Sequence, residues 1–194
     1  LALLTISMVA AAQDRRFVIK GEMSSPVLCY SNEAVTEVKL EMMVDGRSVI
    51  VATSPVVDNK FIFEGTAPAE LDLCNITGFD NGAIQLFLEE GTINVGPFDA
   101  AYPSGARIGG TPNNDMYQAY IDLNSQCVNE AKLRMKEAQA NMPAEVKGDL
   151  GAESKYISSV FHVNNMHFKV AIMDFIYKNI DSPVVLYIIK YSMM

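Results

Sequence analysis

Histidine is the side chain best suited to metal binding and proton transfer near neutral pH. The 194-residue chain contains two, His162 and His167. They lie five positions apart on a predicted helix. Five steps of about 100° place them about 140° apart around the helix axis, whereas side chains on one helix face are three or four residues apart. We therefore expect both histidines on the polar face of a helix, without a shared metal site or a catalytic triad.

Acidic residues supply the other candidate chemistry, because paired carboxylates can act as general acid and base. Glu89 and Glu90 are adjacent at the end of a predicted strand. Neighbouring side chains on a strand point to opposite faces, so we expect these two carboxylates to lie apart. Three aspartates are each followed by Gly or Asn, which is typical of turns rather than of calcium-binding loops: Asp45, Asp58 and Asp80.

A group of aromatic residues lies near the predicted junction of strands and helices. It consists of Phe98, Tyr102, Tyr117 and Tyr120. Aromatic rings can form the wall of a ligand groove between a sheet and a helix, and they also fill hydrophobic seams between such elements. Both interpretations fit these residues, and only the groove would require a ligand.

The composition is that of a globular protein. Hydrophobic residues make up 49% of the chain and charged residues 20%, which excludes collagen-like and low-complexity sequences. The formal net charge is -8. Because an acidic surface repels phosphate backbones, we expect no nucleic-acid partner.

A hydrophobic period of two predicts strands from about residue 16 to residue 95. In residues 37–44, Val38 and Leu40 share one face and charged side chains lie on the other. The following pair, Asp45-Gly46, suits a tight hairpin turn. Short strands joined by such turns favour an antiparallel β-meander or a small β-sandwich.

Beyond residue 110 the hydrophobic spacing becomes helical. The sequence predicts a helix over 111–141, a loop over 142–151 and a second helix over 155–178. Asn179 is a plausible left-handed cap of the second helix. A short third helix is predicted over 184–191 and is apolar on nearly all sides, so another element must cover it.

The change of period predicts an α+β protein with two parts. An antiparallel β domain occupies residues 13–110, and a helical segment occupies residues 111–194. The helical segment either packs on the sheet or leads to a further C-terminal domain.

Residues 1–12, with the sequence LALLTISMVAAA, are typical of the apolar core and cleavage region of a secretory signal peptide. They would form about 18 Å of helix, whereas a bilayer core is roughly 30 Å thick. We expect cleavage after Ala12, export to the periplasm or the extracellular space, and no membrane span in the mature chain. The alternative is a buried N-terminal helix or strand.

The three cysteines, Cys29, Cys74 and Cys127, are widely spaced and form no C-x-x-C motif. An exported compartment permits disulfides, and Cys29 with Cys74 is the first pair to test. An odd number leaves at least one free thiol in a monomer. Three buried free thiols fit the sequence equally well.

Five stretches, in this order and spacing, resemble a known family: Phe17–Gly21, Pro55–Gly65, Leu86–Ile93, Gly110–Asp115 and Phe175–Pro183. The family is an N-terminal domain of unknown function in exported proteins of Gram-negative anaerobes. In those proteins the domain commonly precedes a thioredoxin-like thiol–disulfide oxidoreductase domain. The last stretch resembles the helical connection that leads towards the redox domain.

This resemblance implies an accessory role rather than catalysis. The chemistry of the family belongs to a W-C-x-x-C site in the following domain, and the present chain contains no Trp and no C-x-x-C. We therefore assign no catalytic, cofactor-binding or metal-binding residue, and no cofactor. The expected function is a non-catalytic recognition domain of a thioredoxin-like oxidoreductase, with that domain or an envelope protein as its partner. The alternative is a stand-alone exported binding module with a ligand groove between sheet and helix.

Overall fold

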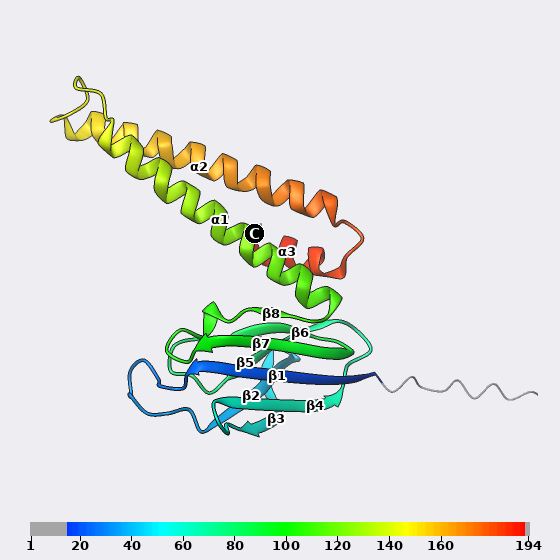
Figure 1. Cartoon of the computed structure of the whole chain (residues 1–194). Coiled ribbons are helices and arrows are strands. Elements are labelled where there is room, and N and C mark those ends of the chain that lie inside the picture. The colour runs from blue at the N-terminus through cyan, green and yellow to red at the C-terminus, as the bar shows by residue number, and fades with distance from the viewer. Residues whose placement is uncertain (1–14, 193–194) are drawn as a thin grey trace, which may run out of the picture. The chain divides into compact units, whose positions relative to one another are not determined.

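The computed structural model describes residues 15–192. The chain divides into a sheet unit, which extends to Thr111, and a helical unit, which begins at Pro112 (Figure 1). The expected signal segment at residues 1–12 lies outside the described residues.

In its described part, residues 15–111, the sheet unit consists of two four-stranded sheets. The first has the strand order β4-β1-β7-β8 and the second the order β3-β2-β5-β6. The strands are β1 (Arg16–Ser25), β2 (Glu37–Val44), β3 (Arg47–Pro55), β4 (Lys60–Thr66), β5 (Asp72–Thr77), β6 (Ile84–Leu88), β7 (Gly91–Asp99) and β8 (Ile108–Gly109). A short 3-10 helix, η1 (Pro103–Gly105), precedes β8.

Of the two predicted β architectures, the structure shows the sandwich. A meander would pair each strand with the next one, but β1 pairs with β4 in antiparallel and with β7 in parallel orientation. The expected antiparallel arrangement is therefore wrong for this one pair. Local alternation of side chains does not encode which distant strand becomes the neighbour.

The core of the sheet unit is built from the inward faces of both sheets. Ile19, Leu40, Ile76 and Ile93 are almost completely buried. Phe61 adds aromatic contacts, because its ring lies edge-on to neighbouring phenylalanine rings, with centroids 5.8 and 6.5 Å apart. The alternation predicted for residues 37–44 is confirmed in the first half of β2, where Val38 and Leu40 face this core. It is not continued to the end of the strand, where Val44 is 49% exposed.

The hairpin turn predicted at Asp45-Gly46 and the turn predicted at Asp58 are confirmed by their backbone angles. Asp45 and Gly46 have φ values of 50° and 75°, and Asp58 and Asn59 have values of 51° and 62°. Two consecutive residues with positive φ form the turn that matches the twist of paired strands. The aspartates thus serve in turns, as their sequence context indicates.

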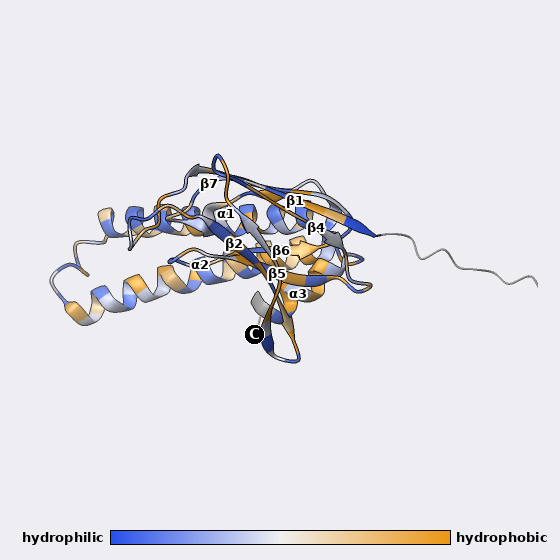
Figure 2. Ribbon diagram, turned by 90° about the horizontal axis from the view of Figure 1, so that it is seen from below, coloured by the Kyte–Doolittle hydropathy of each residue, from blue (hydrophilic) through white to orange (hydrophobic). Residues whose placement is uncertain are grey.

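The helical unit contains three helices, as predicted. They are α1 (Pro112–Ala140), α2 (Leu150–Lys178) and α3 (Pro183–Ser192). The first two form a hairpin, each about 43 Å long at 1.5 Å per residue. In Figure 2 the ribbon of α2 alternates between hydrophobic and hydrophilic residues along its length. No helix between residues 15 and 192 is long and apolar enough to cross a membrane.

Two details of α2 correct the sequence predictions. The helix begins at Leu150, inside the predicted loop, because the side chain of Asp149 accepts hydrogen bonds from the backbone N–H groups of Gly151 and Ala152. At the other end Asn179 has a φ of -123° and is not left-handed. Its side-chain amide instead donates to the carbonyl oxygen of Phe175, 2.8 Å away.

Gly110 occupies a backbone position that excludes a side chain. Its φ is +94°, and a Cβ atom there would lie 2.5 Å from the carbonyl oxygen of Thr92. Gly46 has a φ of +75° but open space around the same position. The two glycines therefore separate the cost of a left-handed backbone from the cost of a steric clash.

We expect Gly46→Ala to lower the free energy of unfolding by about 1 kcal/mol, the cost of a left-handed backbone. Gly110→Ala should lower it by more than about 3 kcal/mol, because the oxygen it meets belongs to a paired strand. Urea unfolding, followed by circular dichroism of the sheet unit, measures both values. Equal losses in the two variants would contradict the close approach at Gly110.

Candidate functional site

The two histidines do not form a site. His162 and His167 are both exposed on α2, as their spacing predicts. Within the described part of the chain, no three His, Cys, Asp or Glu side chains come together in a way that could hold a metal ion. Glu89 is buried whereas Glu90 is exposed, so these neighbouring carboxylates face different environments.

Asp80 has a structural role in the sheet unit. Its carboxylate accepts hydrogen bonds from the backbone N–H groups of Cys29, Tyr30 and Ser31, at 3.1, 2.7 and 3.1 Å. Partial desolvation raises the pKa of Asp80, but the three donors favour the ionised form more strongly, and the pKa lies below its ordinary value of 3.8. The carboxylate thereby fixes a loop that lies some 50 positions earlier in the chain.

The three cysteines differ in burial, because Cys74 is buried whereas Cys29 and Cys127 are partly exposed. All three are free thiols in the structure, so the pair Cys29 and Cys74 is not bridged. Burial raises the pKa of Cys74 from 9.0 to about 12. Burial also raises the pKa of Cys127, and the charge of Glu130 acts in the same direction. Because the thiolate is the reactive form, both environments suppress thiol chemistry.

The aromatic group predicted near the junction divides between the two units. In the helical unit, the rings of Tyr117 and Tyr120 stack with centroids 6.3 Å apart, and both are buried. Tyr117 also contacts Tyr187 on α3, with centroids 5.7 Å apart. In the sheet unit, the ring of Phe98 is buried. These contacts give Phe98, Tyr117 and Tyr120 a packing role within their units, whereas Tyr102, the fourth member of the group, is 61% exposed.

A groove runs between α1 and α2 on one side of the helical hairpin. We name it the hairpin groove and define it by Val128 and Met135 on α1 and by Phe161 and Phe168 on α2. Its volume is about 470 Å³. Val128 is 42% exposed and Phe161 58% exposed, so both walls of the groove present apolar side chains to solvent. The groove exists because two helices alone cannot cover both sides of their seam.

The floor of the hairpin groove contains a polar contact between the helices. The buried side chain of Asn164 accepts a hydrogen bond from Nε of Arg134 at 2.7 Å and donates one to the carbonyl oxygen of Ala131 at 3.3 Å. Arg134 also forms an ion pair with Glu130, at 3.4 Å. A buried polar side chain with a single set of partners fixes the register of two helices. The groove walls are therefore held in one alignment.

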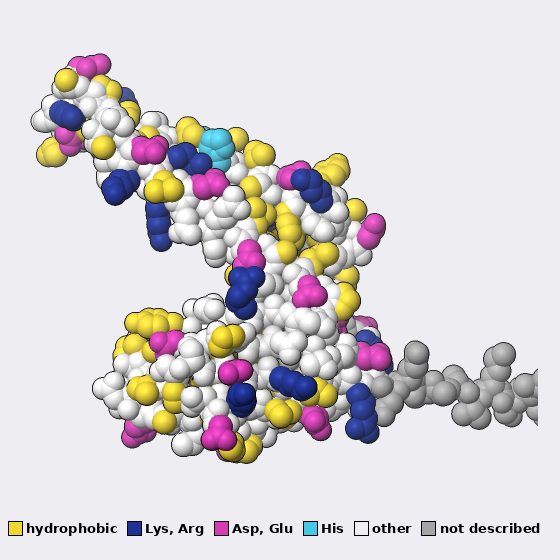
Figure 3. Space-filling view, in the orientation of Figure 1, with side chains coloured by type: hydrophobic (Ala, Val, Ile, Leu, Met, Phe, Trp, Pro, Cys, Tyr) yellow, Lys and Arg dark blue, Asp and Glu magenta, His cyan; other side chains and the backbone are white. Residues whose placement is uncertain are grey.

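A second apolar surface lies on the opposite side of α2. We name it the outer stripe: Val163, Met166, Val170, Met173 and Tyr177. These side chains are 43% to 79% exposed. Figure 3 shows hydrophobic side chains along the surface of the helical unit, with charged groups beside them. No sequence prediction singled out this stripe, although its alternating spacing of three and four residues is visible in the sequence.

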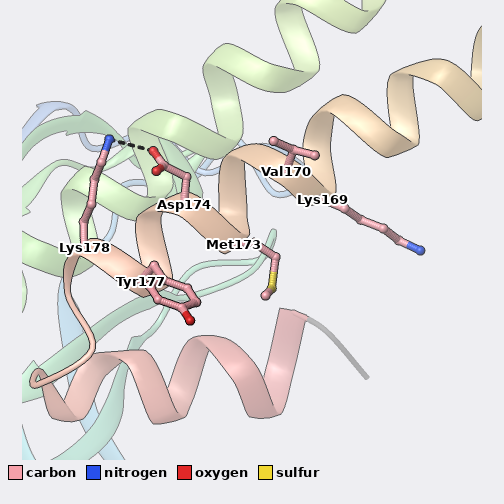
Figure 4. Close-up of a pocket in the computed structure, with 6 residues that line it drawn as sticks. All are labelled: Lys169, Val170, Met173, Asp174, Tyr177 and Lys178. Atoms are coloured by element: carbon pink, nitrogen blue, oxygen red, sulfur yellow. Dashed lines mark ion pairs between the residues drawn. The ribbon is translucent and has the colours of Figure 1, made fainter.

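The C-terminal half of the outer stripe borders a hollow of about 610 Å³. In Figure 4, Met173 and Tyr177 project from the same side of α2, and the ion pair between Lys178 and Asp174 lies on another side. The nitrogen and oxygen atoms of that pair are 2.7 Å apart. The hollow therefore has apolar walls with charges at its margin.

Comparison with known protein families finds a match that covers most of the sheet unit. Residues 17–117 match the domain of unknown function DUF4369, which covers the described strands and the first turns of α1. The chain belongs to this family. No curated protein and no solved structure matches it. The resemblance noted in the sequence is thus confirmed at the level of a domain-of-unknown-function family.

We expect Cys74 to resist alkylation by iodoacetamide in the folded protein at neutral pH. A rise in pKa from 9.0 to about 12 lowers the thiolate fraction about 1,000-fold. Peptide mass spectrometry, with and without denaturant, measures the labelling of each cysteine. Labelling of Cys74 at the same rate in the folded and the unfolded chain would contradict its assignment as a core thiol.

We expect the amide protons of Cys29, Tyr30 and Ser31 to report the titration of Asp80, with a midpoint below 3.8. Because the pKa is lowered in the folded state, its contribution to stability is present above the ordinary pKa. That contribution is lost as the pH falls through the folded-state pKa. NMR of the amide signals against pH makes the measurement. Asp80→Asn should abolish the titration shared by the three amide signals, whereas Asp45→Asn should leave it unchanged. A midpoint above 3.8 would contradict the hydrogen bonds assigned to the Asp80 carboxylate.

Proposed function

We propose that this chain is a non-catalytic recognition domain of an exported thioredoxin-like thiol–disulfide oxidoreductase. In this proposal the thioredoxin-like domain follows in the same natural protein and supplies the W-C-x-x-C site. The hairpin groove is the docking surface, and it is the observation that carries the proposal. Export to the periplasm or the extracellular space is part of the proposal and rests on the signal-like sequence of residues 1–12.

Three properties of the hairpin groove support a protein partner. Its walls present exposed aromatic and branched side chains, Phe161 and Val128, which lose their contact with water when a partner binds. Its floor is aligned by the buried contacts of Asn164. The helices need no ordering on binding, because the hairpin is already formed, and this lowers the entropic cost of association.

The cysteine environments support a proposal in which this chain recognises a partner and a separate domain carries out dithiol exchange. The environments of Cys74 and Cys127 suppress thiolate formation, so dithiol exchange is better served by a separate domain. The recognition domain would then position a substrate protein or the redox domain itself. Membership of DUF4369 is compatible with this role and assigns no chemistry.

A second candidate function is a stand-alone exported binding module. Its supporting observation is the groove volume of about 470 Å³, which lies within the usual range of small-ligand pockets. In this case the hairpin groove would hold a small apolar ligand. Native mass spectrometry of the purified protein would detect such a ligand as an added mass.

Binding of the W-C-x-x-C domain, expressed separately and added to this chain, tests the main proposal. We expect Phe161→Ala to weaken binding at least about ten-fold, since aromatic side chains at exposed grooves dominate binding energy. Met166→Ala is the matched control, because it removes an exposed side chain from the opposite side of the same helix. Isothermal titration calorimetry gives both affinities. Absence of binding, or equal losses in the two variants, would contradict docking in the groove.

A further inference from the structure

We propose that the outer stripe of α2 is a self-association surface, at which a second copy of this chain docks its own α2 in parallel and in register. This inference goes beyond the proposed function, because the outer stripe and the hairpin groove lie on different sides of α2. It rests on the spacing of the exposed side chains, on their shape and on the charges that flank them.

The spacing is that of a coiled-coil seam. From Val163 to Tyr177 the exposed apolar residues follow one another at intervals of three, four, three and four positions. This pattern places Val163, Val170 and Tyr177 at position a of a heptad and the two methionines at position d. A surface with this period matches another helix with the same period, because each side chain then enters a space between four residues of its partner.

The types of residue favour two parallel helices. β-Branched side chains at position a favour parallel two-stranded coiled coils, and two of the three a positions are valines. The stripe is also long enough to matter, about 21 Å at 1.5 Å per residue. Two heptads are too few for isolated helices, but α2 is already folded against α1, so dimerisation need not supply the free energy of helix formation.

The flanking charges select the orientation. Lys169 lies at position g of one heptad and Asp174 at position e of the next, on opposite sides of the stripe. In a parallel pair, position g of one helix faces the following position e of the other, so each Lys169 meets the Asp174 of the second copy. The two-fold axis repeats this attraction. An antiparallel pair places g opposite g and e opposite e and loses it.

The ion pair of Asp174 with Lys178 is compatible with this arrangement. Oδ2 of Asp174 contacts Nζ of Lys178 at 2.7 Å, and a carboxylate has two oxygens and about four acceptor positions. Lys169 forms no ion pair within the described residues that would have to break first. Both charged side chains border the hollow beside Met173 and Tyr177 (Figure 4).

Sedimentation equilibrium of the full chain, at protein concentrations up to the submillimolar range, tests the proposal. We expect a concentration-dependent species of twice the monomer mass. Val170→Asp should weaken dimerisation at least about ten-fold, because it places two like charges opposite each other in the seam. Val170 is 64% exposed, so the variant should retain its fold, which circular dichroism checks.

Charge reversal determines the orientation. Lys169→Glu and Asp174→Lys should each dimerise more weakly alone, because each places like charges at both g–e contacts. An equimolar mixture of the two variants should form a heterodimer with both contacts attractive, and the double variant should regain the original affinity. Phe161→Ala, in the hairpin groove, is the control and should not change self-association.

Three results would overturn the proposal. The first is a monomer at every concentration tested. The second is a dimer whose affinity Val170→Asp leaves unchanged. The third is a dimer whose affinity falls in each single charge reversal and is restored neither in the mixture of the two variants nor in the double variant. None of these results bears on docking in the hairpin groove, which the binding experiment with Phe161→Ala tests separately.

Discussion

The helical unit depends on one constraint: α2 carries apolar side chains on two opposite faces, and a single neighbouring helix can cover only one. The face around Ile172 and Ile176 is buried, and the polar contact between Asn164 and Arg134 fixes the alignment of α2 with α1. The opposite face, from Val163 to Tyr177, is left to solvent. Exposed apolar surfaces of this kind commonly mark protein contacts in water. The hairpin groove and the outer stripe are both exposed because the helical unit has more apolar side chains than its neighbouring helices can cover.

In the sheet unit, apolar side chains fill the core and carboxylates hold separate segments together. Its inward side chains fill one core, and a carboxylate such as Asp80 aligns distant backbone segments rather than facing a substrate. Glu41 behaves in a similar way: hydrogen bonds from the hydroxyl groups of Ser48 and Thr77 lower its pKa and connect three strands. The thiol of Cys74 belongs to the same core. Carboxylates and thiols, which act in catalysis in other proteins, here hold the fold of the sheet unit together.

Local features of the fold could be predicted from the sequence, and features set by distant neighbours could not. Alternation at Val38 and Leu40 and the turn at Asp45 depend on adjacent residues, and the structure confirms them. The parallel pairing of β1 with β7 joins segments more than 70 residues apart, and no local pattern encodes it. The exposure of Phe161 has the same origin, because its burial depends on which helices are present. The periodicity of the outer stripe was present in the sequence, but a second apolar face on one helix has no meaning until the first face is known to be occupied.

We propose that this chain recognises partners for a thioredoxin-like oxidoreductase domain of the same natural protein. The most direct measurement is the intact mass of the natural exported protein, together with the reading frame of its gene beyond Met194. We expect a product larger than 21.3 kDa, cleaved after Ala12 and continuing into a domain with W-C-x-x-C. A stop codon directly after Met194 would contradict the claim and leave the stand-alone binding module as the better description.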